Sequence, residues 1–320
     1  MSIDLDKPRY DQSTYMGRAQ HFLKLTNPLN VFASDKQLDE AKKIVTEFRL
    51  DSLSYAHNKP QSRTMGTKYL YDSAFHPDTG ENNDTPLDAC SAQAPMNTII
   101  TGCMITFYKT TSATVFWQWM NQTFNAVVNY TNRSGDAPLP NSQLLASYCA
   151  ACGGALGTAL FLNSKVKKMK NPTLGRFVPF AAVCGANFIN IPMMRSGELL
   201  NGTPVLTADG QRVGESKTAA RTGIALVCVS RVLMALPGMT LTPMATAYAT
   251  RVGLFRGRQW AAVPFQLFLV GLCVTFATPL CCAIFDQRAS LSVGSLEPEL
   301  QAFMKKNYPK ETHVYFNKGL

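Results

Sequence analysis

Long apolar stretches alternate with short polar ones from about residue 95 to residue 285. Each apolar stretch approaches the roughly 20 residues that a helix needs to cross the hydrocarbon core of a bilayer. Lipid offers no partner to a free backbone N–H or C=O group, so these stretches must be helical. We therefore predict an all-α fold: a polytopic α-helical membrane protein with about five transmembrane helices. The predicted helices lie near residues 95–117, 143–162, 177–194, 222–248 and 263–284.

The first 94 residues are polar and carry no such stretch. Ser34 and Gln37 form a capping box, Ser-x-x-Gln, which predicts that a helix begins there. Apolar residues follow at helical spacing, while the opposite face mixes both charge signs, so we expect this helix to pack within its own domain. The pattern indicates a mostly helical N-terminal soluble domain (1–94), a transmembrane domain (95–285) and a C-terminal tail (286–320).

A short segment of the N-terminal part combines a histidine with a carboxylate. Its proline and glycine predict a turn. A metal site needs three or four converging ligands, so one histidine and one aspartate favour a hydrogen-bonded turn, and we expect no metal. The five residues are His76, Pro77, Asp78, Thr79 and Gly80.

The net charge of +10 comes from the later part of the chain, because the first 95 residues hold slightly more acids than bases. The bases gather in the loops between the second and third and between the fourth and fifth apolar stretches. This distribution is typical of membrane topology rather than of nucleic-acid binding, so we expect no nucleic-acid partner. The positive-inside rule places these loops and the N-terminus on one side, and five crossings place the C-terminus on the other.

The sequence holds no pattern typical of catalysis or of cofactor binding. It lacks GxSxG, Walker A and HExxH motifs, and no GxGxxG precedes a helix, so we expect neither an enzyme nor a bound cofactor. Most of the nine cysteines lie in apolar stretches, where a free thiol behaves as a small hydrophobic group. Cys149 and Cys152 have CxxC spacing, but small residues surround them, which favours helix packing over a redox or metal pair.

Amide side chains gather just beyond the first apolar stretch. Asn121 and Asn125 are four residues apart and share one helical face, with Gln122 beside them. Trp117 and Trp119 precede them, and tryptophan settles at membrane–water interfaces. Amides in an apolar setting need partners. We interpret these three amides as the mouth of a substrate pathway or as a contact between helices.

A positive charge lies about ten residues into the fourth apolar stretch, at Arg231. At that depth a charge costs about 2.5–3.5 kcal/mol on insertion scales. Pro237 and Gly238 follow and should open the helix, which would free backbone carbonyls nearby. Two interpretations stay open: a site for a carboxylate, which arginine binds through two hydrogen bonds, or a structural arginine tied to those carbonyls.

Three further polar residues of the apolar stretches are candidate substrate contacts. Asn187 and Asn190 lie one helical turn apart in the third stretch, where hydrogen bonding between helices is the alternative. Lys109 interrupts the first stretch. It either extends to the membrane surface along its aliphatic chain or joins the substrate site.

Long motifs occur along nearly the whole chain, from Arg9 to Leu320. They are His76–Gly80, Phe116–Trp119, Asn121–Pro138, Arg176–Ala182, Asn190–Arg195, Ser230–Arg231 with Pro237–Met239, and Val314–Leu320. These motifs resemble the sideroflexin family, and Ser134–Pro138 and Cys281-Cys282 are similar to its serine-transporting branch. The resemblance implies a multi-pass protein of the mitochondrial inner membrane that carries serine, with alanine and cysteine as further substrates, into the matrix for one-carbon metabolism. In that membrane the expected topology has the N-terminus in the matrix and the C-terminus in the intermembrane space.

Two other functions are compatible with the same residues. A tricarboxylate or citrate carrier would need more than one deep cation, which Arg231 and Lys109 together could supply. A non-transporting inner-membrane scaffold that affects iron or haem metabolism would use the N-terminal domain as its binding surface. The expected partners are a small amino acid and the lipid bilayer, and the sequence predicts no oligomeric state.

Overall fold

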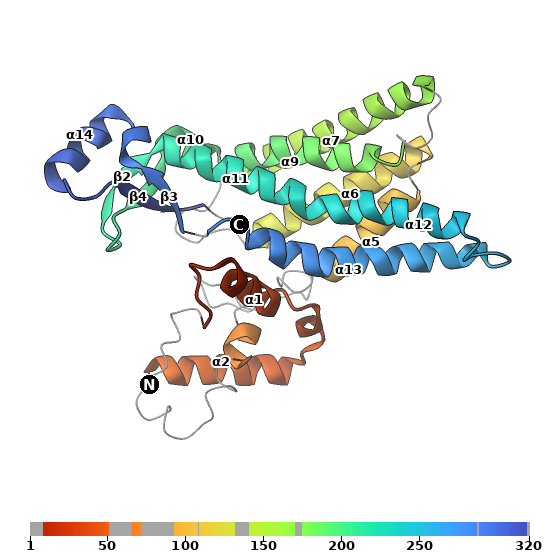
Figure 1. The fold of residues 1–320 in the computed structure, drawn as a ribbon, viewed down its shortest axis with the longest axis horizontal. Helices are drawn as coiled ribbons and strands as arrows, with labels where there is room; N and C mark the ends of the chain where they lie inside the picture. Colours follow the sequence, from red (N-terminus) through yellow and green to blue (C-terminus); the bar gives the residue numbers. More distant parts are fainter. Residues whose placement is uncertain are drawn as a thin grey trace. The chain divides into compact units, whose positions relative to one another are not determined.

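The computed structural model describes residues 9–50, 66–71, 93–107, 109–131, 141–169, 175–286 and 288–318 (Figure 1). Most of these residues are helical, which confirms the predicted all-α membrane class. Within the described ranges, three helical stretches are long and apolar enough to cross a membrane: Ser142–Val166, Lys217–Arg251 and Gln259–Cys282. Val178–Met194 is a shorter apolar helix. The predicted turn at 76–80 lies outside the described residues.

The chain forms two compact units, and each unit combines segments that are distant in the sequence. The first unit contains Met1–Pro138 and Leu236–Ala283, and the second contains Leu139–Ala235 and Ile284–Leu320. The elements of the first unit are α1 (Tyr15–Leu25), η1 (Pro28–Phe32), α2 (Asp35–Leu50), α5 (Gln93–Thr106), α6 (Thr111–Thr131), η2 (Pro237–Leu241), α12 (Thr242–Arg251), η3 (Gln259–Ala261) and α13 (Ala262–Cys282).

Helix α2 begins where the capping box predicts. The Ser34 backbone N–H donates to the Gln37 side-chain oxygen at 2.9 Å, and the helix starts at Asp35. Its buried face places Ala41 and Val45 against Tyr71. Helix α2 therefore packs against Tyr71, another residue of the N-terminal part, as its apolar face predicts.

The first predicted membrane helix, near 95–117, is in fact two helices. Helix α5 ends at Thr106 and α6 begins at Thr111. Lys109 is exposed in the short connection between them. The Thr110 carbonyl accepts hydrogen bonds from both the backbone and the hydroxyl of Thr114, so the polar run that interrupts the apolar stretch becomes the start of α6.

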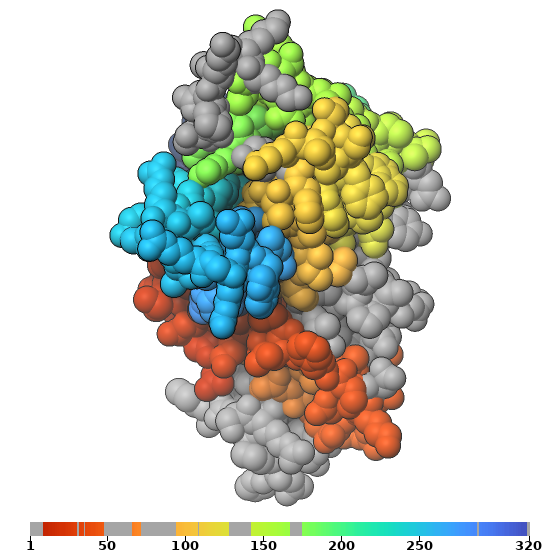
Figure 2. Space-filling view, turned by 90° about the vertical axis from the view of Figure 1, so that its right-hand side faces the viewer, coloured from red at the N-terminus to blue at the C-terminus, as the bar shows by residue number. Residues whose placement is uncertain are grey.

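Helices α5 and α13 pack closely and run antiparallel. Figure 2 shows atoms of the α5–α6 segment, in orange and yellow, beside atoms of the α12–α13 segment, in blue. Gln266, near the start of α13, donates to the Thr106 hydroxyl at the end of α5, at 2.7 Å. Gly102 lies against Leu267, where an added Cβ would come within 2.2 Å of a Leu267 methyl carbon. Small residues thus let the two helices approach, as is common between membrane helices. The register means that α5 begins toward the C-terminal end of α13.

The N-terminal helix α1 lies at that same end of α13. Ala19 and Phe22 of α1 pack against Ala283, with Cys282 alongside. Arg18 of α1 is buried, and its guanidinium donates to the Ala283 carbonyl. A cation here satisfies carbonyl groups that a helix end leaves without partners and complements the helix dipole. The N-terminal segment and the chain that follows α13 therefore start from the same end of this helix.

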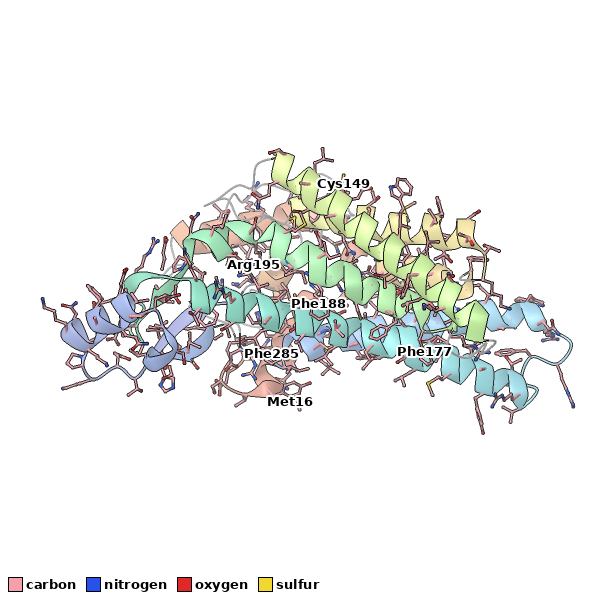
Figure 3. The ribbon with its side chains drawn as sticks, turned by 90° about the horizontal axis from the view of Figure 1, so that it is seen from above. Met16, Cys149, Phe177, Phe188, Arg195 and Phe285 are labelled. Atoms are coloured by element: carbon pink, nitrogen blue, oxygen red, sulfur yellow. The ribbon has the colours of Figure 1, made fainter. Side chains whose placement is uncertain are left out.

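The second unit contains helices and a small sheet. Its elements are α7 (Asn141–Met169), α9 (Val178–Met194), α10 (Ser196–Asn201), β1 (Thr203–Leu206), β2 (Arg212–Ser216), α11 (Lys217–Leu236), β3 (Arg288–Ser292), η4 (Val293–Ser295), α14 (Pro298–Asn307) and β4 (His313–Asn317). Small residues line the contact between α7 and α9, where Ala155 and Ala159 of α7 and Ala182 and Ala186 of α9 are fully buried. Cys149 lies on α7 and is exposed (Figure 3).

Residues 286–320, which the sequence predicts as a C-terminal tail, contain strands and a helix in their described part, 286 and 288–318. They contribute β3, α14 and β4 to an antiparallel sheet of order β2-β1-β4-β3. Val205, Val314 and Phe316 form its core together with Met304 of α14. Strands β1 and β2 come from the loop before α11, so the partners of the C-terminal strands are about a hundred residues away in sequence. Local patterns do not reveal such distant pairing.

Candidate functional site

Helix α6 turns its polar face into the protein and its apolar face outward. Gln118, Asn121 and Gln122 are only 1%, 6% and 2% exposed, whereas Phe116 and Trp119 are 45% and 44% exposed. A soluble amphipathic helix has the opposite arrangement. The inverted pattern is expected of a membrane helix, where polar residues face the protein interior or an aqueous path. We call Gln118, Asn121 and Gln122 the amide face.

The amide face carries polar atoms that have no hydrogen-bond partner among the described residues. These atoms are Gln118 Oε1, Asn121 Nδ2 and Gln122 Nε2. A buried polar group without a partner costs about 1–3 kcal/mol, and most buried polar groups in proteins do have one. Three such groups within five consecutive residues of one helix therefore indicate a place where a solute or water completes the hydrogen bonding.

The position of the amide face in the helix is also informative. Gln118 to Gln122 occupy the middle of α6, which spans Thr111–Thr131. The helix contains no Asp, Glu, Lys or Arg. Thr114 extends the buried polar face by one turn in one direction, and the partly buried Asn125 extends it in the other. The result is a continuous polar stripe without formal charge.

Two other predicted contacts of the first unit, Pro237 and Gly238, do not open the helix. They begin η2, a π-helical turn within the continuous helical stretch Lys217–Arg251. Such turns within α-helices are frequent at functional sites. A Cβ at the buried Gly238 would lie 3.8 Å from Cβ of Cys273 in α13. The helix therefore continues through a local widening that packs on α13, while Pro237, which has no N–H, cannot donate to the carbonyl of the preceding turn.

Lys109 is not part of a helix. It is exposed in the connection between α5 and α6, so its charge needs no buried partner. This exposure fits the prediction that Lys109 extends to a polar surface better than it fits the prediction that Lys109 joins the substrate site.

The remaining predicted contacts belong to the second unit. Asn190 is buried on α9 and Asn187, one turn earlier, is partly buried, while Phe188 between them is exposed (Figure 3). Arg231 is partly buried on α11. The structure thus places Asn121, Gln122 and Asn125 along one face of α6. Asn187 and Asn190 lie one turn apart on α9, in the second unit.

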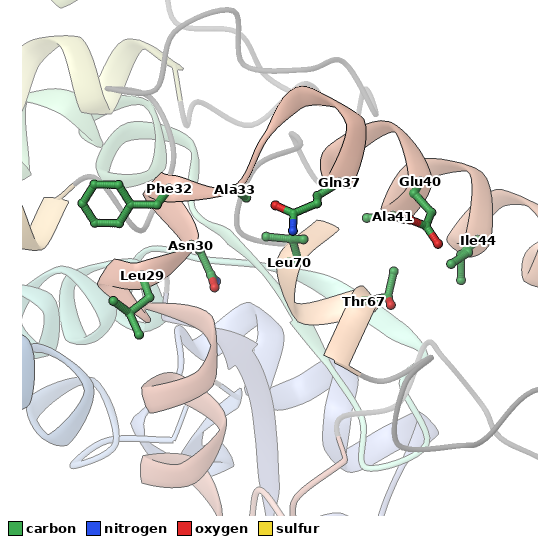
Figure 4. Close-up of a pocket in the computed structure, with 10 residues that line it drawn as sticks. All are labelled: Leu29, Asn30, Phe32, Ala33, Gln37, Glu40, Ala41, Ile44, Thr67 and Leu70. Carbon is green, nitrogen blue, oxygen red and sulfur yellow. The ribbon is translucent and has the colours of Figure 1, made fainter.

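A cavity of about 430 Å³ lies elsewhere, in the N-terminal part of the first unit (Figure 4). It is formed by η1, α2 and residues 66–71, and its polar lining includes Asn30, Gln37 and Glu40. None of the residues predicted to contact substrate lines it. Among the residues that the structure describes, no group of three or more His, Cys, Asp or Glu side chains is placed to hold a metal ion.

Gln118 is the functional candidate that sequence reasoning missed. It stands between Trp117 and Trp119, whose side chains suggested a membrane boundary rather than an interior. The signal was nevertheless present, because Gln118, Asn121, Gln122 and Asn125 follow the i, i+3, i+4, i+7 spacing of one helical face.

Comparisons with known proteins give a consistent result over the whole chain. The family model described as sideroflexins matches residues 4–320. Sideroflexin-1 of Homo sapiens is 51% identical over 319 residues, and sideroflexin-1 of Mus musculus is 50% identical, with all of this chain and 98% of each relative covered. Sideroflexin-3 of Rattus norvegicus is 50% identical over 320 residues, with the same coverage. No solved structure matches the chain.

Proposed function

The chain belongs to the sideroflexin family, and from this premise we propose that it carries small neutral amino acids, serine first among them, across the mitochondrial inner membrane. Alanine and cysteine are the further substrates of this proposal, and transport toward the matrix would supply one-carbon metabolism. The observation that carries the proposal is the amide face of α6. Its buried, unpartnered amides suit a small polar solute better than they suit lipid or a purely structural helix contact.

The chemistry of the substrate follows from what a zwitterion needs. Its carboxylate requires hydrogen-bond donors and its ammonium requires acceptors, while its net charge is zero. An amide supplies both kinds of partner without adding a charge to the membrane interior. Arg231, Asn187 and Asn190 belong to the second unit and stay sequence-based predictions of substrate contacts, outside the amide face. No step of this function uses a cofactor or a chemical reaction.

A tricarboxylate substrate has less support. Three carboxylates would need several cations close to the pathway. Lys109, the second cation that such a carrier would use, is exposed in the connection between two helices. We therefore retain the zwitterion as the substrate class.

We propose an orientation in which the N-terminal domain and the C-terminal sheet both face the intermembrane space. This revises the sequence-based expectation for the N-terminus alone. The support comes from α1, which lies at the C-terminal end of α13, and from the helix pair α5–α6. A helical hairpin returns the chain to the side from which it enters, whether or not its short first helix spans the full bilayer. The basic loops then face the matrix, as the positive-inside rule requires.

Uptake of labelled serine into proteoliposomes that contain the purified protein tests the function. We expect uptake above that of protein-free liposomes, competition by unlabelled alanine and cysteine, and no competition by citrate. Stronger competition by citrate than by alanine would favour the tricarboxylate carrier. Absence of serine uptake by correctly inserted protein would reject the proposed function.

A further inference from the structure

The amide face of α6 offers one free acceptor and two free donors within a single helical turn. Gln118 contributes the unpartnered oxygen, and Asn121 and Gln122 contribute the unpartnered NH₂ groups. Residues three and four apart on a helix have Cβ atoms about 5–6 Å apart, so all three side chains can reach one small solute. The donors are adjacent in sequence and the acceptor is one turn before them.

We propose that this face is an electroneutral binding site that holds the carboxylate of an amino acid at Asn121 and Gln122 and its ammonium at Gln118. The inference deepens the proposed transport function and rests on it. It places the primary contact at three uncharged side chains rather than at Arg231, which the sequence offered as a candidate carboxylate site. It also adds Gln118, which was not among the contacts predicted from the sequence.

The absence of charge on α6 determines which solutes the site accepts. A zwitterion brings equal and opposite charges, and the amide dipoles can complete both sets of hydrogen bonds. A solute with net charge would leave that charge uncompensated on a helix that has no Asp, Glu, Lys or Arg, and an uncompensated charge in the membrane interior is costly. The site should therefore accept serine, alanine and cysteine and reject lysine and aspartate.

If these amides had a structural role, we would expect each of them to be hydrogen-bonded to a neighbouring helix. Amides that join helices are paired, as Gln143 of α7 is: its side chain donates to the Met193 carbonyl of α9 at 3.2 Å and also to the Ser196 hydroxyl. The three amides of α6 are more deeply buried than Gln143, yet each keeps an atom without a partner among the described residues. Buried polar groups that have no partner until a ligand binds lower the stability of the ligand-free protein. Replacing them with apolar groups of similar shape should therefore raise that stability.

The test combines thermal unfolding with uptake for three near-isosteric variants, Gln118→Met, Asn121→Leu and Gln122→Met, in the full-length protein. Without ligand, each variant should unfold at the wild-type temperature or a few degrees above it. Serine should raise the unfolding temperature of the wild type but not of the variants, and serine uptake by the variants should fall at least tenfold. Gln143→Met is the matched control: it should unfold at a lower temperature yet keep its stabilisation by serine.

The outcomes separate this site from the function on which it rests. A wild type that responds to serine, with amide-face variants that respond equally, overturns the site alone. Variants that unfold several degrees lower and keep their serine response show that the amides are structural, which also overturns the site. A wild type that neither takes up serine nor is stabilised by it overturns the proposed function and this inference together. Stabilisation of the wild type by lysine or aspartate as strong as that by serine overturns the electroneutral selection.

Discussion

The side chain of Arg18 donates from Nε to the backbone carbonyl of Ala283 at 2.9 Å, across 265 residues of sequence. Its Nη1 atom also donates to the carbonyls of Gln12 and Ser13, at 2.9 and 3.0 Å. One buried guanidinium therefore joins the N-terminal segment to the end of α13, which is the last helix long and apolar enough to cross a membrane within the described ranges.

Loss of this guanidinium should destabilise the N-terminal segment. Arg18→Met keeps most of the aliphatic chain but leaves three carbonyls without their donor, which we expect to cost about 2–3 kcal/mol because hydrogen bonds to charged groups are among the stronger ones. Limited proteolysis should cleave the variant near residues 9–25 earlier than the wild type. Lys24→Gln, an exposed residue of the same helix, is the control and should leave the cleavage pattern unchanged.

Glycine substitutions should have opposite effects at two positions. A Cβ at Gly17 would lie 1.9 Å from the backbone oxygen of Asp11, which a side-chain movement cannot relieve, so Gly17→Ala should cost more than about 1 kcal/mol. Gly153 in α7 has nothing within 4 Å of the equivalent position. Gly153→Ala should be neutral or stabilise by up to about 1 kcal/mol, because alanine is the better helix former. Thermal unfolding of both variants measures the contrast, and equal effects would contradict the packing at Gly17.

The two termini should be accessible from the same side of the membrane. Epitope tags placed at each end should both be digested by protease when the outer membrane alone is ruptured. A protein with one protected tag and one digested tag would contradict the arrangement of α1 at the end of α13. A tag in the basic loop between α12 and α13, at residues 252–258, serves as the internal control and should stay protected.

Acid should weaken one contact of the second unit. Glu297 accepts hydrogen bonds from the Thr218 backbone N–H at 2.9 Å and from the Thr218 hydroxyl at 3.1 Å, at the start of α11. Burial by itself would raise the pKa of Glu297, but these hydrogen bonds to the charged form outweigh it and lower the pKa below the usual value.

A lowered pKa in the folded state means that Glu297 stabilises the fold at pH above the usual value for glutamate, about 4.3. This contribution disappears as the pH falls through the lower folded value. Glu297→Gln should therefore unfold at a lower temperature than the wild type at pH 7, and the difference should shrink below about pH 4. Glu299→Gln, at an exposed position two residues later, should show no such pH-dependent difference. A constant difference at all pH values would exclude the carboxylate as its cause.

Sequence patterns predicted the elements that depend on local information. The capping box at Ser34 and Gln37 marked the start of α2, and apolar length identified the helices around 142–166 and 259–282. The split between α5 and α6 was missed because average hydropathy continues across Lys109. The hydrogen bonds from Thr114 to the Thr110 carbonyl show that a polar interruption of an apolar stretch can mark the start of a new helix.

The rest depended on information that no local pattern contains. Strand β4 alternates buried Val314 and Phe316 with more exposed neighbours, but its partner β1 is far away in the sequence. The amide face was visible as a spacing, yet only burial distinguishes amides that lack partners from amides exposed to water. Gln118 therefore became a candidate only when its surroundings were known.

The four-stranded sheet can form only after the last of its strands in the sequence is present. Strand β4, at residues 313–317, lies between β1 and β3 in the sheet. The sheet cannot be completed until residues 313–317 have been synthesised, and loss of these residues would leave the β1–β2 pair and β3 unjoined. Formation of the sheet therefore has to wait for β4, the last of its strands in the sequence.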